Sequence, residues 1–73
     1  MTDKIIEIIS DVLDAEIDVN TSQMTCKQWD SLRHLNIIIA LEEAFDLSFE
    51  PEEIALMKEV VIIERLIKQK KTV

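Results

Sequence analysis

The chain has 73 residues, 48% of them hydrophobic, and its fifteen acidic residues against eight basic ones give a formal charge of −7. A chain of this length makes one small domain, residues 1–73, whose stability depends on a dense core. The negative charge argues against nucleic acid as a partner, because phosphates would be repelled, and it favours proteins with basic surfaces.

Signals for a membrane, a disulfide or a metal are lacking in the sequence. No apolar stretch has the length of a membrane span, and acids interrupt the N-terminal apolar run where a secretory leader would be continuous. The single cysteine, Cys26, cannot form an intrachain disulfide and is compatible with a reducing compartment. Cys26 and the single histidine, His34, do not make a structural zinc site. We therefore expect a monomeric cytoplasmic protein with no metal and no membrane partner.

Residues 3–14 show the periodicity of an amphipathic helix. Ile, Val and Leu side chains recur on one side at about 100° per residue, and acidic residues lie on the other. Thr2 is suited to cap this helix, and the pattern stops at Asp14 and Ala15.

Residues 15–29 lack this periodicity and are rich in Asp, Asn, Thr, Ser and Gln, which predicts a long loop even without glycine. A long irregular segment in a small domain is often functional, and this one leads directly to Ser31. We expect its large apolar residues to anchor it to the core: Ile17, Val19, Met24 and Trp29.

Residues 31–45 form the longest apolar-periodic segment and predict a second helix. One arc is suited to face the core, and a second apolar stripe is bordered by Asn36, Glu42 and Glu43. The core-facing arc is His34, Ile37, Ile38, Leu41 and Phe45, and the second stripe is Leu32, Leu35 and Ile39. The second stripe is either buried beneath the long loop or exposed as a docking patch with an acidic rim.

Two further helices are predicted. Pro51 at a first helical position, with acids after it, starts a brief helix to about Met57, preceded by a loop over 46–50 with a buried Phe49. A last amphipathic helix has its apolar side at Val60, Ile62, Ile63, Leu66 and Ile67. Its bases match the negative end of the helix dipole and are expected to be solvated: Arg65, Lys68, Lys70 and Lys71. The predicted fold class is all-α, a small four-helix bundle of three main helices and a short third one, with a long loop between helices 1 and 2.

Ser31 stands at the start of the helix predicted over 31–45. A helix N-terminus carries unpaired N–H groups and roughly half a positive charge, which would stabilise a phosphate ester on the serine hydroxyl. The plainer explanation is that Asp30 or Ser31 only caps the helix. Ser31 and His34 are three residues apart and could approach each other, but no Gly-rich oxyanion loop accompanies them, so we do not expect an enzyme.

A set of residues around and after Ser31 has a recognisable order and spacing: Asp30-Ser31-Leu32, Leu35, Ile39, Leu41-Glu42-Glu43, Phe45 and Glu50-Pro51-Glu52-Glu53. In these residues the chain resembles the acyl carrier proteins, over essentially its whole length. The resemblance implies that Ser31, flanked by Asp30 and Leu32, carries a covalent 4′-phosphopantetheine that a phosphopantetheinyl transferase takes from coenzyme A. Acyl-type cargo would be held as a thioester on the terminal thiol, and separate acyl-activating, transferring or condensing enzymes would act on it.

The resemblance also implies roles for further residues. Enzymes with basic docking surfaces would bind the helix after the serine through Asp30, Leu35, Ile39, Glu42 and Glu43. The core would open to hold the cargo chain between Leu41, Phe45, Phe49, Ile54, Met57 and Ile63, although the same residues would also make an ordinary packed core. Because Phe49 and Met57 could restrict the volume, we expect short cargo more than long.

The chain departs from the family pattern next to the motif. Gln28 and Trp29 stand where the family has a glycine before Asp-Ser-Leu, and Arg33 stands where an acid is common. An arginine here would repel basic partners, unless it is a solvated residue of no consequence. We therefore expect a stand-alone carrier for a specialised pathway, such as polyketide or other specialised metabolite biosynthesis. The alternatives are a general carrier of fatty acid biosynthesis, an aminoacyl or peptidyl carrier, and an unmodified helical interaction module.

Overall fold

The structure is a computed structural model that describes residues 2–71; the two ends of the predicted domain, residue 1 and residues 72–73, lie outside the described residues. The described part contains four helices: α1 Thr2–Leu13, α2 Ser31–Phe45, α3 Pro51–Leu56 and α4 Val60–Lys71. Residues 2–71 hold no strand, only an isolated antiparallel bridge between Ser22 and Glu59. The predicted all-α fold, with a short third helix and a long loop between the first two, is confirmed.

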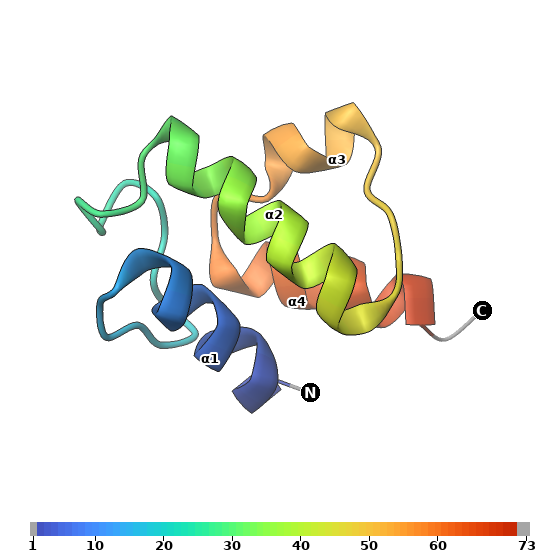
Figure 1. The fold of residues 1–73 in the computed structure, drawn as a ribbon, viewed down its shortest axis with the longest axis horizontal. Helices are drawn as coiled ribbons and strands as arrows, with labels where there is room; N and C mark the ends of the chain where they lie inside the picture. The colour runs from blue at the N-terminus through green and yellow to red at the C-terminus, as the bar shows by residue number, and fades with distance from the viewer. Residues whose placement is uncertain (1, 72–73) are drawn as a thin grey trace.

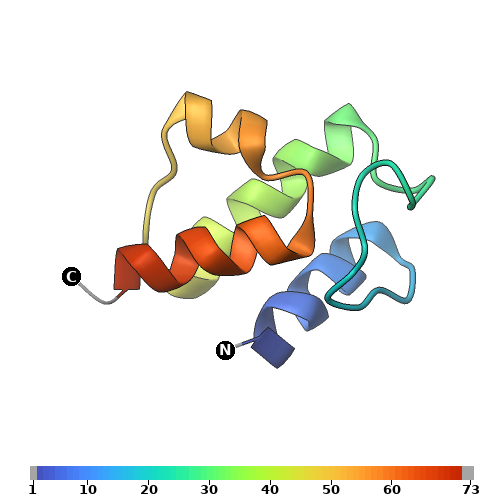
Figure 2. The same cartoon turned by 180° about the vertical axis from the view of Figure 1, so that it is seen from behind.

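The three long helices enclose the core. Figure 1 shows α2 crossing in front of α4, with α1 and α3 on opposite sides of this pair, and Figure 2 gives the same arrangement from behind. Each long helix buries side chains spaced three or four residues apart, as an amphipathic helix must to keep one stripe inside. The core consists of Ile5, Ile9, Leu13, Cys26, Trp29, Ile37, Ile38, Leu41, Phe49, Met57, Val60, Ile63 and Ile67.

The helix ends show how a chain without glycine makes sharp turns. Asp14 follows α1 and Asp46 follows α2, and both adopt a left-handed backbone with φ of 53°. Short polar residues tolerate this conformation better than branched or bulky ones. The N–H of Asp46 donates to the Glu42 carbonyl and closes the last turn of α2.

The cap predicted for the first helix is wrong. Thr2 already lies within α1, and its hydroxyl donates to the carboxylate of Glu64 on α4. The side chain therefore makes a contact between two helices, which local sequence does not reveal.

Only part of the predicted anchoring of the long loop is found. Trp29 is buried and Ile17 packs against the core, but Val19 is exposed and Met24 is 97% exposed, so both of those predictions are wrong. Val19 lies in a turn in which the Thr21 N–H donates to the Asp18 carbonyl. Met24 lies in a second turn, in which the Thr25 N–H donates to the Ser22 carbonyl and the Ser22 N–H to the Thr25 hydroxyl. This turn places Met24 at its tip, pointing outward, because local hydrogen bonds decide its direction.

The basic end of α4 is not simply solvated, as its sequence had suggested. The Lys70 ammonium forms an ion pair with Glu53 at 2.9 Å and lies 5.6 Å from the centre of the Phe49 ring. The Lys71 ammonium donates to the Phe45 carbonyl at 2.9 Å. These two lysines therefore fasten α4 to α3 and to the end of α2.

Candidate functional site

At the N-terminus of α2, the capping residue and the candidate nucleophile are two different residues. Asp30 is the N-cap, and its carboxylate accepts from the Arg33 N–H at 2.8 Å. Ser31 is the first residue of the helix and is exposed, and its hydroxyl makes no hydrogen bond to any residue in the described range 2–71. The capping role thus belongs to Asp30, and the hydroxyl of Ser31 is left available for chemistry.

His34 links the segments around Ser31. The indole N–H of the buried Trp29 donates to His34 Nδ1 at 2.9 Å, and His34 Nε2 lies 2.9 Å from the Ile54 carbonyl oxygen. Because Nδ1 accepts, Nε2 carries the proton and donates to the Ile54 carbonyl. Both ring nitrogens are occupied, and neither is free to take a proton from Ser31.

An open groove lies beside Ser31, between the N-terminal half of α2 and α3. Its volume is about 400 Å³. We call it the Ser31 groove; its lining residues are Gln23, Ser31, His34, Leu35, Pro51, Ile54, Ala55 and Lys58. The sequence predicted His34 as a hydrogen-bonded histidine at the boundary of the core, which the half-buried side chain confirms, and it had given no role to Gln23, Ala55 or Lys58. Only the three-residue spacing from Ser31 to His34 was a signal for this neighbourhood.

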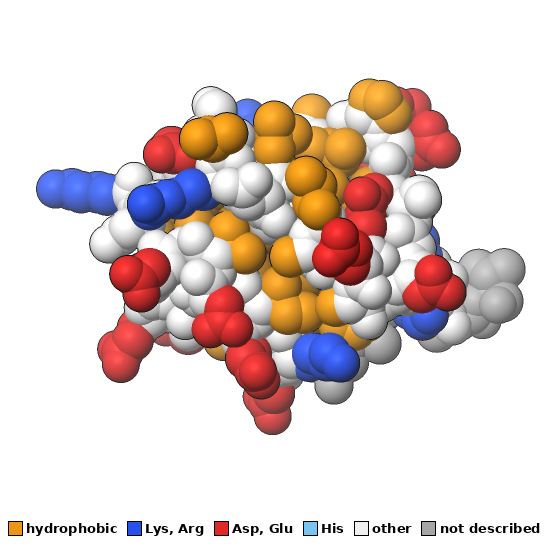
Figure 3. Space-filling model, viewed as in Figure 1, with side chains coloured by type: hydrophobic (Ala, Val, Ile, Leu, Met, Phe, Trp, Pro, Cys, Tyr) orange, Lys and Arg blue, Asp and Glu red, His pale blue; other side chains and the backbone are white. Residues whose placement is uncertain are grey.

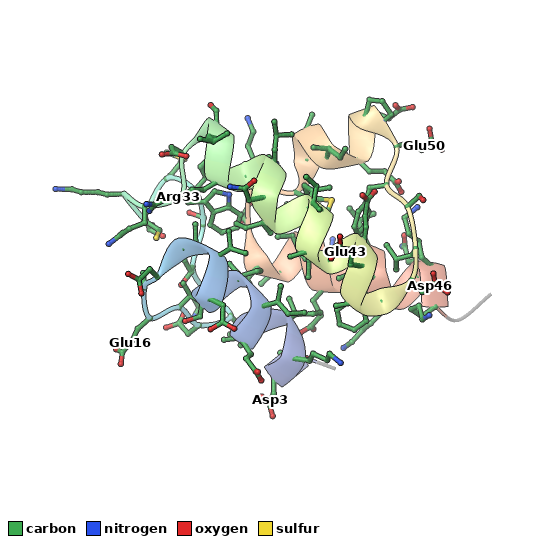
Figure 4. All side chains as sticks on the ribbon, viewed as in Figure 1. Asp3, Glu16, Arg33, Glu43, Asp46 and Glu50 are labelled. Carbon is green, nitrogen blue, oxygen red and sulfur yellow. The ribbon has the colours of Figure 1, made fainter. Side chains whose placement is uncertain are left out.

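The second apolar stripe of α2 is exposed. Leu32, Leu35 and Ile39 are 70%, 53% and 54% exposed, so burial beneath the long loop is wrong. Figure 3 shows hydrophobic side chains gathered over α2 and α3, with acidic side chains beside them, and Figure 4 places Glu43 on the same open face of α2. An apolar centre with a charged rim is the anatomy of many protein interfaces.

Glu42, the other acid expected on this rim, is partly used inside the molecule. It is half-buried, and its carboxylate accepts from the Phe49 N–H at 2.9 Å. The contact satisfies a backbone donor in the loop between α2 and α3. Glu42 therefore shapes this loop, whereas Glu43 is exposed to solvent.

Arg33 is also engaged inside the molecule. Its guanidinium donates to the Leu13 carbonyl at 3.5 Å and to the Gln28 carbonyl at 3.4 Å, and the residue is half-buried. Leu13 is the last residue of α1, where helix carbonyls are unpaired and a positive charge is stabilising. Figure 4 shows Arg33 on the side of α2 next to the long loop. The side chain of Arg33 is thus not fully solvated.

The structure brings the predicted pocket residues together as packed core. Leu41, Phe49, Met57 and Ile63 are buried, and Phe45 and Ile54 pack against them. Of these six residues, only Ile54 lines the Ser31 groove. The surface feature next to Ser31 is therefore outside the core.

Two acids of the C-terminal half are held in their charged form. The Glu50 N–H, and then the Lys70 ammonium, donate to Glu53 and lower the pKa of its carboxyl. The Thr2 hydroxyl, and then Lys68, lower the pKa of Glu64 in the same way. Hydrogen bonds to the carboxylate favour the ionised form.

Comparison with protein-family models and with curated proteins finds no match to this chain. Within residues 2–71, no helix has the length and apolar character needed to cross a membrane. The same residues contain no group of three His, Cys, Asp or Glu side chains placed to hold a metal ion.

Proposed function

We propose that this protein is an acyl carrier that holds its cargo as a thioester on a 4′-phosphopantetheine attached to Ser31. The observation that carries the proposal is the free, exposed hydroxyl of Ser31 at the first position of α2, with the cap supplied by Asp30. The resemblance of the surrounding sequence to acyl carrier proteins supports the same assignment. The helix N-terminus would stabilise the phosphodiester anion.

The attachment is a phosphoryl transfer in which the protein is the substrate. A phosphopantetheinyl transferase directs the Ser31 Oγ to the pantetheine-side phosphorus of coenzyme A. A new O–P bond forms, the pyrophosphate bond breaks, adenosine 3′,5′-bisphosphate leaves, and the hydroxyl proton passes to the transferase or to solvent. His34 takes no part, because both of its nitrogens are hydrogen-bonded within the fold.

Enzymes that load, modify or remove the cargo would dock on the exposed stripe of Leu32, Leu35 and Ile39. Glu43 and the net negative charge of the chain favour partners with basic surfaces. We propose a carrier that serves a specialised pathway, since Arg33 stands beside the attachment site where an acid would favour the partners of general fatty acid synthesis.

The test is the intact mass of the protein after incubation with coenzyme A and a phosphopantetheinyl transferase. The parent should gain one phosphopantetheine, and Ser31→Ala should gain none. Ser48→Ala, which removes another exposed serine, is the matched control and should still be modified. Ser31→Ala should remain folded, because Asp30 provides the cap.

An unmodified parent, tested with several transferases, would reject the carrier proposal. The exposed stripe on α2 would then favour the second candidate, a helical interaction module that uses the same surface without any prosthetic group.

A further inference from the structure

Helix α3 is held in place by its ends, by the packing of Ile54 against the core and by two polar contacts. None of its residues is buried, whereas Phe49 before it and Met57 after it are. Glu53 pairs with Lys70 of α4, and the Ile54 carbonyl accepts from His34 of α2. A short helix with no fully buried residue depends on such contacts for its position.

The contact to α2 is the end of a chain of hydrogen bonds. Trp29 donates to His34, and His34 donates to Ile54, so the end of the long loop, α2 and α3 are joined through one imidazole. The Trp29 and His34 rings are also stacked, with centroids 6.1 Å apart and planes inclined by 27°. Because Trp29 is only 2% exposed, the donor is fixed and the imidazole has one favourable orientation.

This chain of bonds separates the groove from the core. His34 and Ile54 both line the Ser31 groove. The Ile54 carbonyl also accepts from the N–H of Met57, whose side chain is fully buried with Leu41 and Ile63. A chain attached at Ser31 can enter the groove without breaking any of these contacts. Met57 and Leu41 do not line the groove, so a chain bound there would reach them only if α3 moved away from α2 and broke the bond from His34 to Ile54.

We propose that the Trp29–His34–Ile54 chain is a latch that keeps thioester-linked cargo outside the core and so restricts this carrier to short acyl groups held in the Ser31 groove. The proposal rests on the function proposed above. The groove, about 400 Å³, falls at the small end of the ~300–1,000 Å³ range of ligand pockets and suits a small group. His34 is thus a positioning residue for α3 that determines cargo length.

The latch itself is tested on the unmodified protein. His34→Phe keeps a ring of similar size and removes both hydrogen bonds. Amide exchange of Ala55, Leu56 and Met57 should become about fivefold faster, as expected when one tertiary hydrogen bond to α3 is lost. Gln23→Ala, a change in the lining of the same groove outside the latch, is the control and should leave these rates unchanged. Equal exchange in the parent and His34→Phe would overturn the latch.

The cargo restriction is tested with acetyl, butyryl and octanoyl arms transferred from the corresponding acyl-coenzyme A. In the parent, the side-chain NMR signals of Leu41, Met57 and Ile63 should be the same for all three arms. In His34→Phe the octanoyl arm should shift these signals. Octanoyl-dependent shifts in the parent, or none in the variant, would overturn the restriction.

Two further outcomes keep the proposals distinguishable. If His34→Phe does not fold, His34→Leu replaces it, since that change also removes both hydrogen bonds. If the parent accepts no arm from any transferase, the proposed carrier function and the cargo restriction both fail, while the exchange experiment still decides whether the latch exists.

Discussion

The ammonium of Lys70 lies 2.9 Å from the carboxylate of Glu53, so the last turn of α4 holds the first turn of α3. Both side chains are about three-quarters shielded from solvent, and Lys70 also lies over the Phe49 ring. An ion pair that is shielded in this way should contribute more to the stability of the fold than an ion pair between two solvated side chains.

Lys70→Met should therefore lower the free energy of unfolding by about 1 kcal/mol, measured by urea denaturation. Lys68→Met is the matched control, because Lys68 pairs with Glu64 within α4 and is far more exposed. The control substitution should lower the free energy of unfolding by less than about 0.5 kcal/mol. Equal losses in the two variants would contradict a tertiary role for Lys70.

Stability should fall as the pH drops below the ordinary carboxyl value of 4.5, because the folded protein lowers the pKa of Glu53 and Glu64. Above that value both groups are ionised in the folded and unfolded states, and their contribution is fully present. As the pH decreases below 4.5, these two carboxylates are protonated first in the unfolded chain, which lowers the free energy of unfolding. The stabilisation is lost completely once the pH has fallen below the lower pKa of the folded state.

Thermal unfolding of the parent between about pH 6 and pH 3 measures this dependence, compared with the double variant Glu53→Gln/Glu64→Gln. The double variant should show a smaller fall in melting temperature over the acidic range. Glu7→Gln, at an exposed position of α1, should behave as the parent does. If the melting temperature of the double variant falls with pH as steeply as that of the parent, other acids determine the pH dependence of stability.

Local signals in the sequence were sufficient to predict the helices. The helix predicted over 31–45 begins and ends at those residues in the structure, and α3 begins at Pro51 as predicted. Both have strong local causes, a continuous apolar period in the first case and Pro followed by acids in the second.

Two of the wrong predictions concern side chains whose partners are distant in the chain, and one concerns a local turn. Thr2 meets Glu64, and Lys71 meets Phe45, so neither contact has a local pattern. Met24 was predicted to anchor the loop to the core because it is apolar, but the turn between Ser22 and Thr25 directs its side chain outward. Periodicity predicts which face of a helix is buried and does not identify the tertiary partners of polar side chains.

Arg33→Gln should lower the free energy of unfolding by about 1 kcal/mol, because the guanidinium donates to two backbone carbonyls, one of them at the end of α1. The matched control is Arg65→Gln, the same substitution at an exposed position of α4. Arg65→Gln should lower the free energy of unfolding by less than about 0.5 kcal/mol. Comparable losses, measured by urea denaturation, would mean that the contacts of Arg33 add nothing to stability.

The proposed preference for a specialised pathway is tested by partner kinetics. The phosphopantetheinylated parent, Arg33→Gln and Arg33→Glu are compared as acceptors of malonyl groups from a transacylase of fatty acid synthesis, at a temperature where all three are folded. If Arg33 repels a basic partner, kcat/KM should rise from the parent to Gln and again to Glu, with the differences shrinking at high salt.

The intermediate variant separates two effects of Arg33. Loss of its contacts to Leu13 and Gln28 is common to both substitutions, so a structural effect would change both variants similarly and would not depend on salt. A graded, salt-dependent gain follows only from charge, because Glu differs from Gln by one further unit. A parent that already accepts malonyl groups as well as a housekeeping carrier, with no gain in Arg33→Glu, would remove the basis for assigning this protein to a specialised pathway.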